Sequence, residues 1–148
     1  NYVSTSQKSI FQYVKQKKLS NVQLKRLLNY LSLACYSYSN SALSKNDLQS
    51  AEFFIGLYHL VDPENPEPAY LLGTLRMRQH KPELALDALK ESIHTGFEDL
   101  QRISNDTNLD PVRNSPAYRI MIRYIKGRQE IQQRGKPDKT KKMQIEKN

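Results

Sequence analysis

Three histidines and one cysteine are the side chains of this 148-residue sequence best suited to catalysis or metal binding. His59, His80 and His94 lie far apart along the chain, and they do not form a zinc-site spacing with a cysteine or an acidic residue. His59 and His94 fall at the ends of predicted helices, where the helix dipole favours a cation. We therefore predict no catalytic residue, no metal and no cofactor, and a protein that is not an enzyme.

The single cysteine, Cys35, excludes an internal disulfide and lies on the apolar face of a predicted helix. No Lys, Arg or His adjoins it in the sequence to lower its pKa, so we expect Cys35 to pack in the core rather than to react.

The glycines are isolated from one another, which excludes a glycine-rich phosphate loop. They are Gly56, Gly73, Gly96, Gly127 and Gly135.

The elements that would position any functional group recur with a 34-residue period. An apolar run opens at residues 46–51 and closes at 61–65, and a second opens at 80–85 and closes at 94–97. Ala51 and Ala85 occupy equivalent places in these runs. Helical periodicity and turn residues predict two helix pairs, namely 21–44 with 47–61 and 67–79 with 82–95.

The boundaries of these pairs are marked by proline and glycine. Pro63, Pro66 and Pro68 cannot all lie inside a helix, and Gly96 is placed to end one. Outside the pairs, we predict a first helix over 4–18, a short helix over 98–104, a loop over 105–108 and a last helix over 116–133. Residues 134–148 are polar and rich in lysine, which predicts a flexible tail.

The 34-residue period and the residues at five positions resemble the tetratricopeptide-repeat family. Leu72 and Gly73, then Ala85, Leu89 and Ser92, match the family's Leu-Gly, alanine, large and small positions. The stretch 109–118, with its Leu-Asp-Pro and later Pro-x-aromatic pattern, looks like the closing segment of many bacterial arrays. Its Asp-Pro, at 110–111, follows that at 62–63 by neither one period nor two, so we expect an irregular third unit.

The resemblance implies an all-α, right-handed superhelix of antiparallel helix pairs with extra terminal helices. The implied domain covers residues 1–133, with helix pairs at about 21–61 and 67–95 and a capping unit at 98–133. A basic tail, 134–148, would follow. Close packing between repeat helices would fall on Ala51, Gly73 and Ala85.

In this family the first helix of each unit lines a concave groove that binds peptides. The residues that the resemblance places on this wall, where we expect them to be at least partly exposed, are Tyr36, Asn40, Tyr70, Thr74 and Met77. Tyrosine offers contact area and a hydrogen bond at low entropic cost, which suits peptide recognition. The alternative is that the two tyrosines only pack between neighbouring helices. The family's basic clamp for a terminal carboxylate is not expected, because of that set only Asn40 is present.

The net charge of +8 is concentrated at the two ends of the chain. Residues 1–46 carry seven basic and no acidic side chains, residues 47–125 carry eight and twelve, and residues 126–148 carry eight and three. Clustered positive charge suits a phosphate-rich or anionic surface. The residues concerned are Lys8, Lys15, Lys17, Lys18, Lys25, Arg26 and the C-terminal lysines.

Binding of a protein or peptide by a non-catalytic scaffold, serving alone or as a module of a larger protein, is the function that the sequence favours. Weak binding to nucleic acid or an anionic surface through the basic ends is the first alternative. Nucleic acid is not the expected partner, because the repeat core is net negative and carries no base-reading motif. An accessory domain of an enzyme is the second alternative.

No small-molecule substrate and no membrane-spanning segment are indicated. The compartment stays open between the cytoplasm and, if a leader was removed, the bacterial cell envelope.

Overall fold

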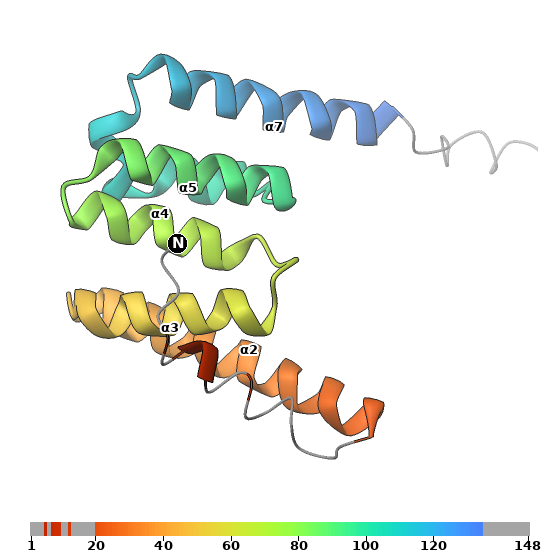
Figure 1. The fold of residues 1–148 in the computed structure, drawn as a ribbon. Helices are drawn as coiled ribbons and strands as arrows, with labels where there is room; N and C mark the ends of the chain where they lie inside the picture. The colour runs from red at the N-terminus through yellow and green to blue at the C-terminus, as the bar shows by residue number, and fades with distance from the viewer. Residues whose placement is uncertain (1–4, 6, 10–11, 13–19, 135–148) are drawn as a thin grey trace, which may run out of the picture.

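The computed structural model describes residues 5, 7–9, 12 and 20–134, and these residues form helices and turns without a strand (Figure 1). The all-α prediction is therefore confirmed for the described part of the chain. The elements, in order, are α2 (Asn21–Ser44), α3 (Leu48–Val61), α4 (Glu67–Arg78), α5 (Pro82–Thr95), α6 (Leu100–Asn105), the 3-10 helix η1 (Thr107–Val112) and α7 (Pro116–Arg134).

The helices pack as the sequence predicted, in two pairs of neighbours. Helix α2 packs along α3, α4 packs along α5, and α3 joins the two pairs by packing on α4. Figure 1 shows the helices stacked in one direction, from α2 and α3 at the bottom to α7 at the top. The predicted boundaries hold to within one residue at each end of the four helices, because caps and prolines mark them in the sequence.

The 34-residue period is visible in the backbone as well as in the sequence. Helices α3 and α5 begin at Leu48 and Pro82, and both α2 and α4 end two residues before a residue of positive φ. These residues are Asn46 (φ 56°) and His80 (φ 58°). In both turns a following N–H donates to a carbonyl five residues earlier, from Asp47 to the carbonyl of Ala42 at 2.9 Å in the first. The two turns therefore reverse the chain by the same geometry.

The segment after α5, where the sequence predicted an irregular third unit, departs from the repeat before α7 but not at α7 itself. Helix α7 begins at Pro116, one full period after Pro82 begins α5. The element before it is divided into α6 and η1, where the sequence predicted a loop over 105–108. That expectation was wrong because Asp106 accepts a hydrogen bond from the N–H of Asn108 and so caps a new turn, which Pro111 continues as a 3-10 helix.

The ends of the chain lie largely outside the described residues. Thr5, residues 7–9 and Gln12 are helical, and the remainder of the helix predicted over 4–18 is not described. Gln7 is buried, and its side-chain amide donates to the carbonyl of Phe53 in α3. Helix α7 ends at Arg134, and the tail predicted from there to residue 148 is not described beyond that residue.

The core consists of two apolar clusters that meet at α4. One cluster joins α2, α3 and α4 and includes Cys35, Ile55 and Leu75. The other joins α4 and α5 to the third unit and includes Leu89 and Ile125. Nine of the twelve residues of α4 are buried, so this helix has neighbours on all sides. Of the helices described, none combines the length and apolar character needed to cross a bilayer.

Helices α4 and α5 approach each other closely at Gly73. A Cβ atom on Gly73 would lie 2.9 Å from two side-chain carbons of Leu89 and 3.3 Å from the carbonyl oxygen of Ala85. Ala51 and Ala85 are both completely buried. The predicted close approach of helices is therefore seen at Gly73 and Ala85, and Ala51 is shown to be buried.

Replacing Gly73 with alanine should lower stability, although alanine is the better helix former. Leu89 is fully buried and cannot move away, so we expect the overpacked site to cost about 1–3 kcal/mol. Gly127 in α7 provides a matched control, because a Cβ there meets nothing within 4 Å. Gly127→Ala should stabilise the protein by up to about 1 kcal/mol through helix propensity alone. If urea unfolding showed that Gly73→Ala and Gly127→Ala change the free energy of unfolding in the same direction, the close packing at Gly73 would be contradicted.

Candidate functional site

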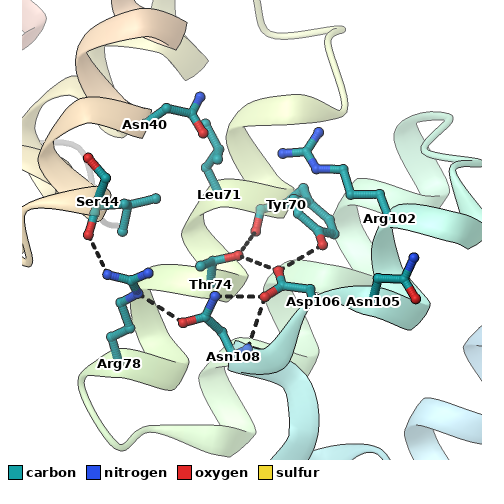
Figure 2. A pocket seen from close by; sticks show the side chains of 11 residues that line it. Asn40, Ser44, Tyr70, Leu71, Thr74, Arg78, Arg102, Asn105, Asp106 and Asn108 are labelled. Atoms are coloured by element: carbon teal, nitrogen blue, oxygen red, sulfur yellow. Dashed lines mark hydrogen bonds between the residues drawn. The ribbon is translucent and has the colours of Figure 1, made fainter.

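A pocket of about 410 Å³ opens between the C-terminal half of α2, one side of α4 and the turn from α6 to η1 (Figure 2). Helix α4 lies between the other two segments, because it packs on both α2 and η1. Most of the lining side chains are polar. The lining residues are Asn40, Leu43, Ser44, Tyr70, Leu71, Thr74, Arg78, Arg102, Asn105, Asp106 and Asn108.

The carboxylate of Asp106 organises one wall of this pocket. One of its oxygens accepts from the hydroxyl of Tyr70 at 2.8 Å and from the hydroxyl of Thr74 at 3.3 Å. The other accepts from the backbone N–H of Asn108 at 3.0 Å and from its side-chain amide at 2.6 Å. Figure 2 shows these bonds converging from α4 and from the turn. This carboxylate is the acceptor for the buried hydroxyl of Tyr70, whereas the hydroxyl of Thr74 can also donate to the backbone carbonyl of Tyr70, at 3.4 Å.

Two arginines lie on either side of this carboxylate. Arg78 donates to the side-chain oxygen of Asn108 at 2.9 Å and to the backbone carbonyl of Leu43 at the end of α2. Arg102 makes a two-pronged ion pair with Glu67, at 2.8 and 2.5 Å. Arg78 therefore connects all three segments that surround the pocket, and Arg102 joins α6 to the start of α4.

The ring of Tyr70 is held between these polar groups and the core. It stacks on Phe97 with 4.4 Å between ring centroids, and the guanidinium of Arg102 lies 4.4 Å from its centre. Burial, together with the adjacent charge of Asp106, raises the pKa of Tyr70 far above its usual range. Burial alone would lower the pKa of Arg102, but Glu67 raises it overall, with smaller contributions from Tyr70 and Tyr36. Both groups keep their ordinary charge states across the physiological range.

The structure brings only part of the predicted concave wall to this pocket. Asn40, Tyr70 and Thr74 line it, whereas Tyr36 and Met77 do not. Tyr36 is 37% exposed and Asn40 is half-buried, as expected for a binding surface. Tyr70, Thr74 and Met77 are buried, so the expectation that these three side chains would be exposed was wrong.

The difference between the two equivalent tyrosines comes from the residues that follow them. Tyr70 is covered by Phe97 and Arg102 of the next unit. One period earlier, the positions equivalent to these two are Pro63 and Pro68, which offer neither an aromatic ring nor a cation. Tyr36 is therefore left at the surface, where it makes an edge contact with Tyr58. Tyr70 is thus packed against neighbouring elements, as the alternative expected, and it also lines the pocket.

Several lining residues were not predicted from the sequence, above all Arg102, Asp106 and Asn108. A signal for one of them exists, because Asn40, Thr74 and Asn108 follow one another at the repeat period. Extending the period into the third unit would have placed Asn108 on the same wall. Arg102 and Asp106 have no such signal, since their positions depend on the break between α6 and η1.

The residues considered for catalysis are scattered over the structure. His59 lies in the last turn of α3, His80 in the turn after α4, and His94 in the last turn of α5. Within the described residues, no group of three potential metal-binding side chains comes together. Cys35 is 2% exposed, and burial raises the pKa of its thiol to about 11. The prediction that Cys35 packs in the core is confirmed.

Of the basic residues considered for binding to anionic surfaces, three are described. Lys8, Lys25 and Arg26 are all exposed. Lys15, Lys17, Lys18 and the lysines of the tail lie outside the described residues. The described residues therefore do not test whether these basic side chains form one surface.

The chain was compared with protein-family models, curated proteins and solved structures, and no significant match was found.

Removing the carboxylate of Asp106 should destabilise the protein by leaving the buried hydroxyl of Tyr70 without an acceptor. We expect Asp106→Ala to cost about 1–3 kcal/mol in urea unfolding. The same substitution in a Tyr70→Phe background should cost less, because the hydroxyl that would lose its acceptor is then absent. Asp110→Ala is the control, since its exposed pair with Arg113 should contribute about 0–1 kcal/mol. If the changes in unfolding free energy caused by Tyr70→Phe and Asp106→Ala were strictly additive, the hydrogen bond between Tyr70 and Asp106 would be contradicted.

The thiol of Cys35 should react slowly while the protein is folded. At pH 8 its raised pKa alone lowers the thiolate fraction by about 100-fold relative to an unfolded chain, and burial restricts access further. Because the folded pKa is the higher one, the associated stability is complete below pH 9 and is lost as the pH rises towards 11. Labelling with a chromogenic disulfide reagent, with and without denaturant, measures the combined effect of the raised pKa and of burial on the reactivity of the thiol. Equal labelling rates in the two conditions would show that Cys35 is accessible.

Proposed function

We propose that this chain is a short tetratricopeptide-like array that binds a segment of another protein, without catalysis, in the pocket between α2, α4 and the α6–η1 turn. The observation that carries the proposal is the convergence of three successive first helices on one polar pocket. The resemblance places peptide binding on the same helices. The right-handed superhelix and its relation to bacterial arrays are part of this proposal.

The repeated backbone geometry supports the family assignment. The turns at Asn46 and His80 are one period apart, and the starts of α3, α5 and α7 follow one another at the same spacing. The close approach at Gly73 supplies the small residue that neighbouring repeat helices need. The positive φ values and helix starts are properties of the backbone, so they support the resemblance independently of the residue types that carry it.

The pocket suits the main chain of an extended peptide. The exposed carboxamide of Asn105 offers a donor and an acceptor, which is the combination that a peptide unit also presents. Asn40 and Asn108 each use one N–H within the protein, to the carbonyl of Tyr36 and to Asp106, and each has a second N–H to offer. The volume lies within the range of about 300–1,000 Å³ typical of ligand sites, which is enough for a few residues. Tyr36 is exposed near Arg102 and offers an aromatic surface for a peptide that continues along α2.

The charge around the pocket suits a neutral or polar segment rather than a strongly charged one. Arg102 is neutralised by Glu67 at 2.5 Å, and both oxygens of Asp106 are already engaged. Side-chain specificity would then come from shape and from the carboxamides. We therefore expect binding that depends only weakly on salt, in contrast to the behaviour of a nucleic-acid complex.

Selection from a library of displayed random peptides, followed by fluorescence anisotropy with the selected peptide, tests this function. We expect Asn105→Ala and Tyr36→Ala each to weaken binding by about tenfold or more, which corresponds to about 1.4 kcal/mol. Both side chains are exposed, so the variants should stay folded. Asn114→Ala removes an exposed carboxamide outside the pocket and is the matched control. A selected peptide that bound all three variants equally well would exclude the pocket.

A further inference from the structure

Helix α7 carries a second apolar stripe in addition to the one that faces the core. The stripe consists of Ala117, Ile120, Tyr124, Gly127 and Ile131, which follow one another at alternating intervals of three and four residues. Ile120 is 59% exposed, Tyr124 49% and Ile131 72%. Alternation of three and four is the spacing by which one helix packs along another. The stripe is therefore arranged for a helical neighbour rather than scattered over the surface.

The stripe borders a groove that α7 forms with α5. The groove encloses about 210 Å³ and is lined by Ile93, Met121, Ile120 and Tyr124, with Lys90 and His94 on the α5 side. Met121 and Ile93 are buried and form its floor, so an apolar side chain inserted here would meet the core. Figure 1 shows α7 at the end of the stack, and no described element lies beyond it.

The surroundings of the stripe are basic. Helix α7 contains five arginines and lysines against one acid, Glu130. Arg123 lies three residues after Ile120, which places it beside the stripe on the helix surface. Arg123 is exposed and forms no ion pair with a described residue, whereas Arg128 is paired with Glu98 at 2.6 Å. On the opposite side of the groove, Lys90 has only an exposed pair with Asp87.

We propose that the α5–α7 groove is a docking surface for an acidic amphipathic helix of another protein. The apolar side chains of that helix would lie on Ile120, Tyr124 and Ile131, and its carboxylates would face Arg123 and Lys90. From Ala117 to Ile131 the stripe covers about 21 Å of helix, enough for two heptads of a partner. This surface is separate from the pocket and does not depend on its function.

Charge distinguishes this occupant from the two that the chain itself could supply. A second copy would bring the same basic helix against this one, and like charges along a helix interface oppose association. The C-terminal segment 135–148 has five lysines and two acidic residues, so it is also basic. An acidic helix is the partner whose charge complements the rim and whose apolar spacing matches the stripe.

A pair of designed helical peptides tests the proposal with the full chain. Both carry leucine at heptad positions a and d, and the remaining positions are mainly glutamate in one and mainly lysine in the other. We expect the acidic peptide to bind in anisotropy titrations, with affinity that falls as salt is raised, and the basic peptide not to bind. Ile120→Asp should abolish binding of the acidic peptide, because it places a carboxylate in the groove.

A matched pair of charge reversals locates the site. Lys90→Glu should weaken binding of the acidic peptide by about tenfold or more. Lys126→Glu makes the same change in charge at an exposed position of α7 turned away from the stripe, and it should have a clearly smaller effect. Neither substitution should affect a peptide bound in the α2–α4 pocket, so failure of this proposal is distinguishable from failure of the proposed function.

Three results would overturn the proposal. Equal binding of the acidic and basic peptides would show an apolar surface without charge selectivity. Equal effects of Lys90→Glu and Lys126→Glu would show attraction to net charge rather than to the groove. Sedimentation that showed a dimer of the unmodified chain, converted to a monomer by Ile120→Asp, would assign the surface to a second copy.

Discussion

The burial of α4 on all sides is the constraint on which the rest of this structure depends. A helix with neighbours all round must have a small residue where another helix crosses it closely, and Gly73 provides it against Leu89 and Ala85 of α5. It must also find partners for every polar side chain that it carries inward. Tyr70 and Thr74 are such side chains, and their hydroxyls reach the same oxygen of Asp106.

The candidate pocket follows from the way these requirements are met. Asp106 lies at the break between α6 and η1, where its carboxylate caps η1 and accepts from the hydroxyls of α4. The residues on either side of this break, Asn105 and Asn108, line the pocket together with residues of α2 and α4. Arg78 then connects the break to the end of α2 through Asn108 and the carbonyl of Leu43. The wall of the pocket is thus held by the same bonds that satisfy the buried helix, which favours a preformed site.

The two binding surfaces proposed for this chain differ in their physical character. In the α2–α4 pocket Arg102 is paired with Glu67, and Arg78 and Asp106 are hydrogen-bonded to neutral groups of the protein, so recognition would come from carboxamides, hydroxyls and shape. In the α5–α7 groove the floor is apolar and the rim is basic, so recognition would come from burial of side chains and from charge. A short helical array can separate two such surfaces because each unit presents its first and second helices to different neighbours. Polar groups gather where three first helices converge, and apolar groups stay exposed where the stack ends.

The sequence by itself determined the helices and their pairing, because these depend on local signals. Caps such as Asp47, prolines such as Pro82 and the glycine at Gly96 end or begin helices through interactions within a few residues. The 34-residue period indicated two alanines that are buried, Ala51 and Ala85, and the glycine of the close approach, Gly73. The sequence also placed Cys35 in the core, since its neighbours along the helix face are apolar.

Only the tertiary structure decided which of two equivalent tyrosines is exposed. Tyr36 and Tyr70 have the same place in the period, but Phe97 and Arg102, which cover Tyr70, belong to later elements of the chain. The same holds for Asp106, whose role depends on the hydroxyls of α4, distant in the sequence. The 34-residue period predicts which residues occupy equivalent places on their helices. Whether such a residue is buried depends on the segment that packs over it, and the segment over Tyr70, which includes Phe97 and α6, does not follow the period. The second stripe of α7 was readable in the sequence, but its exposure was decided by the position of α7 at the end of the described stack.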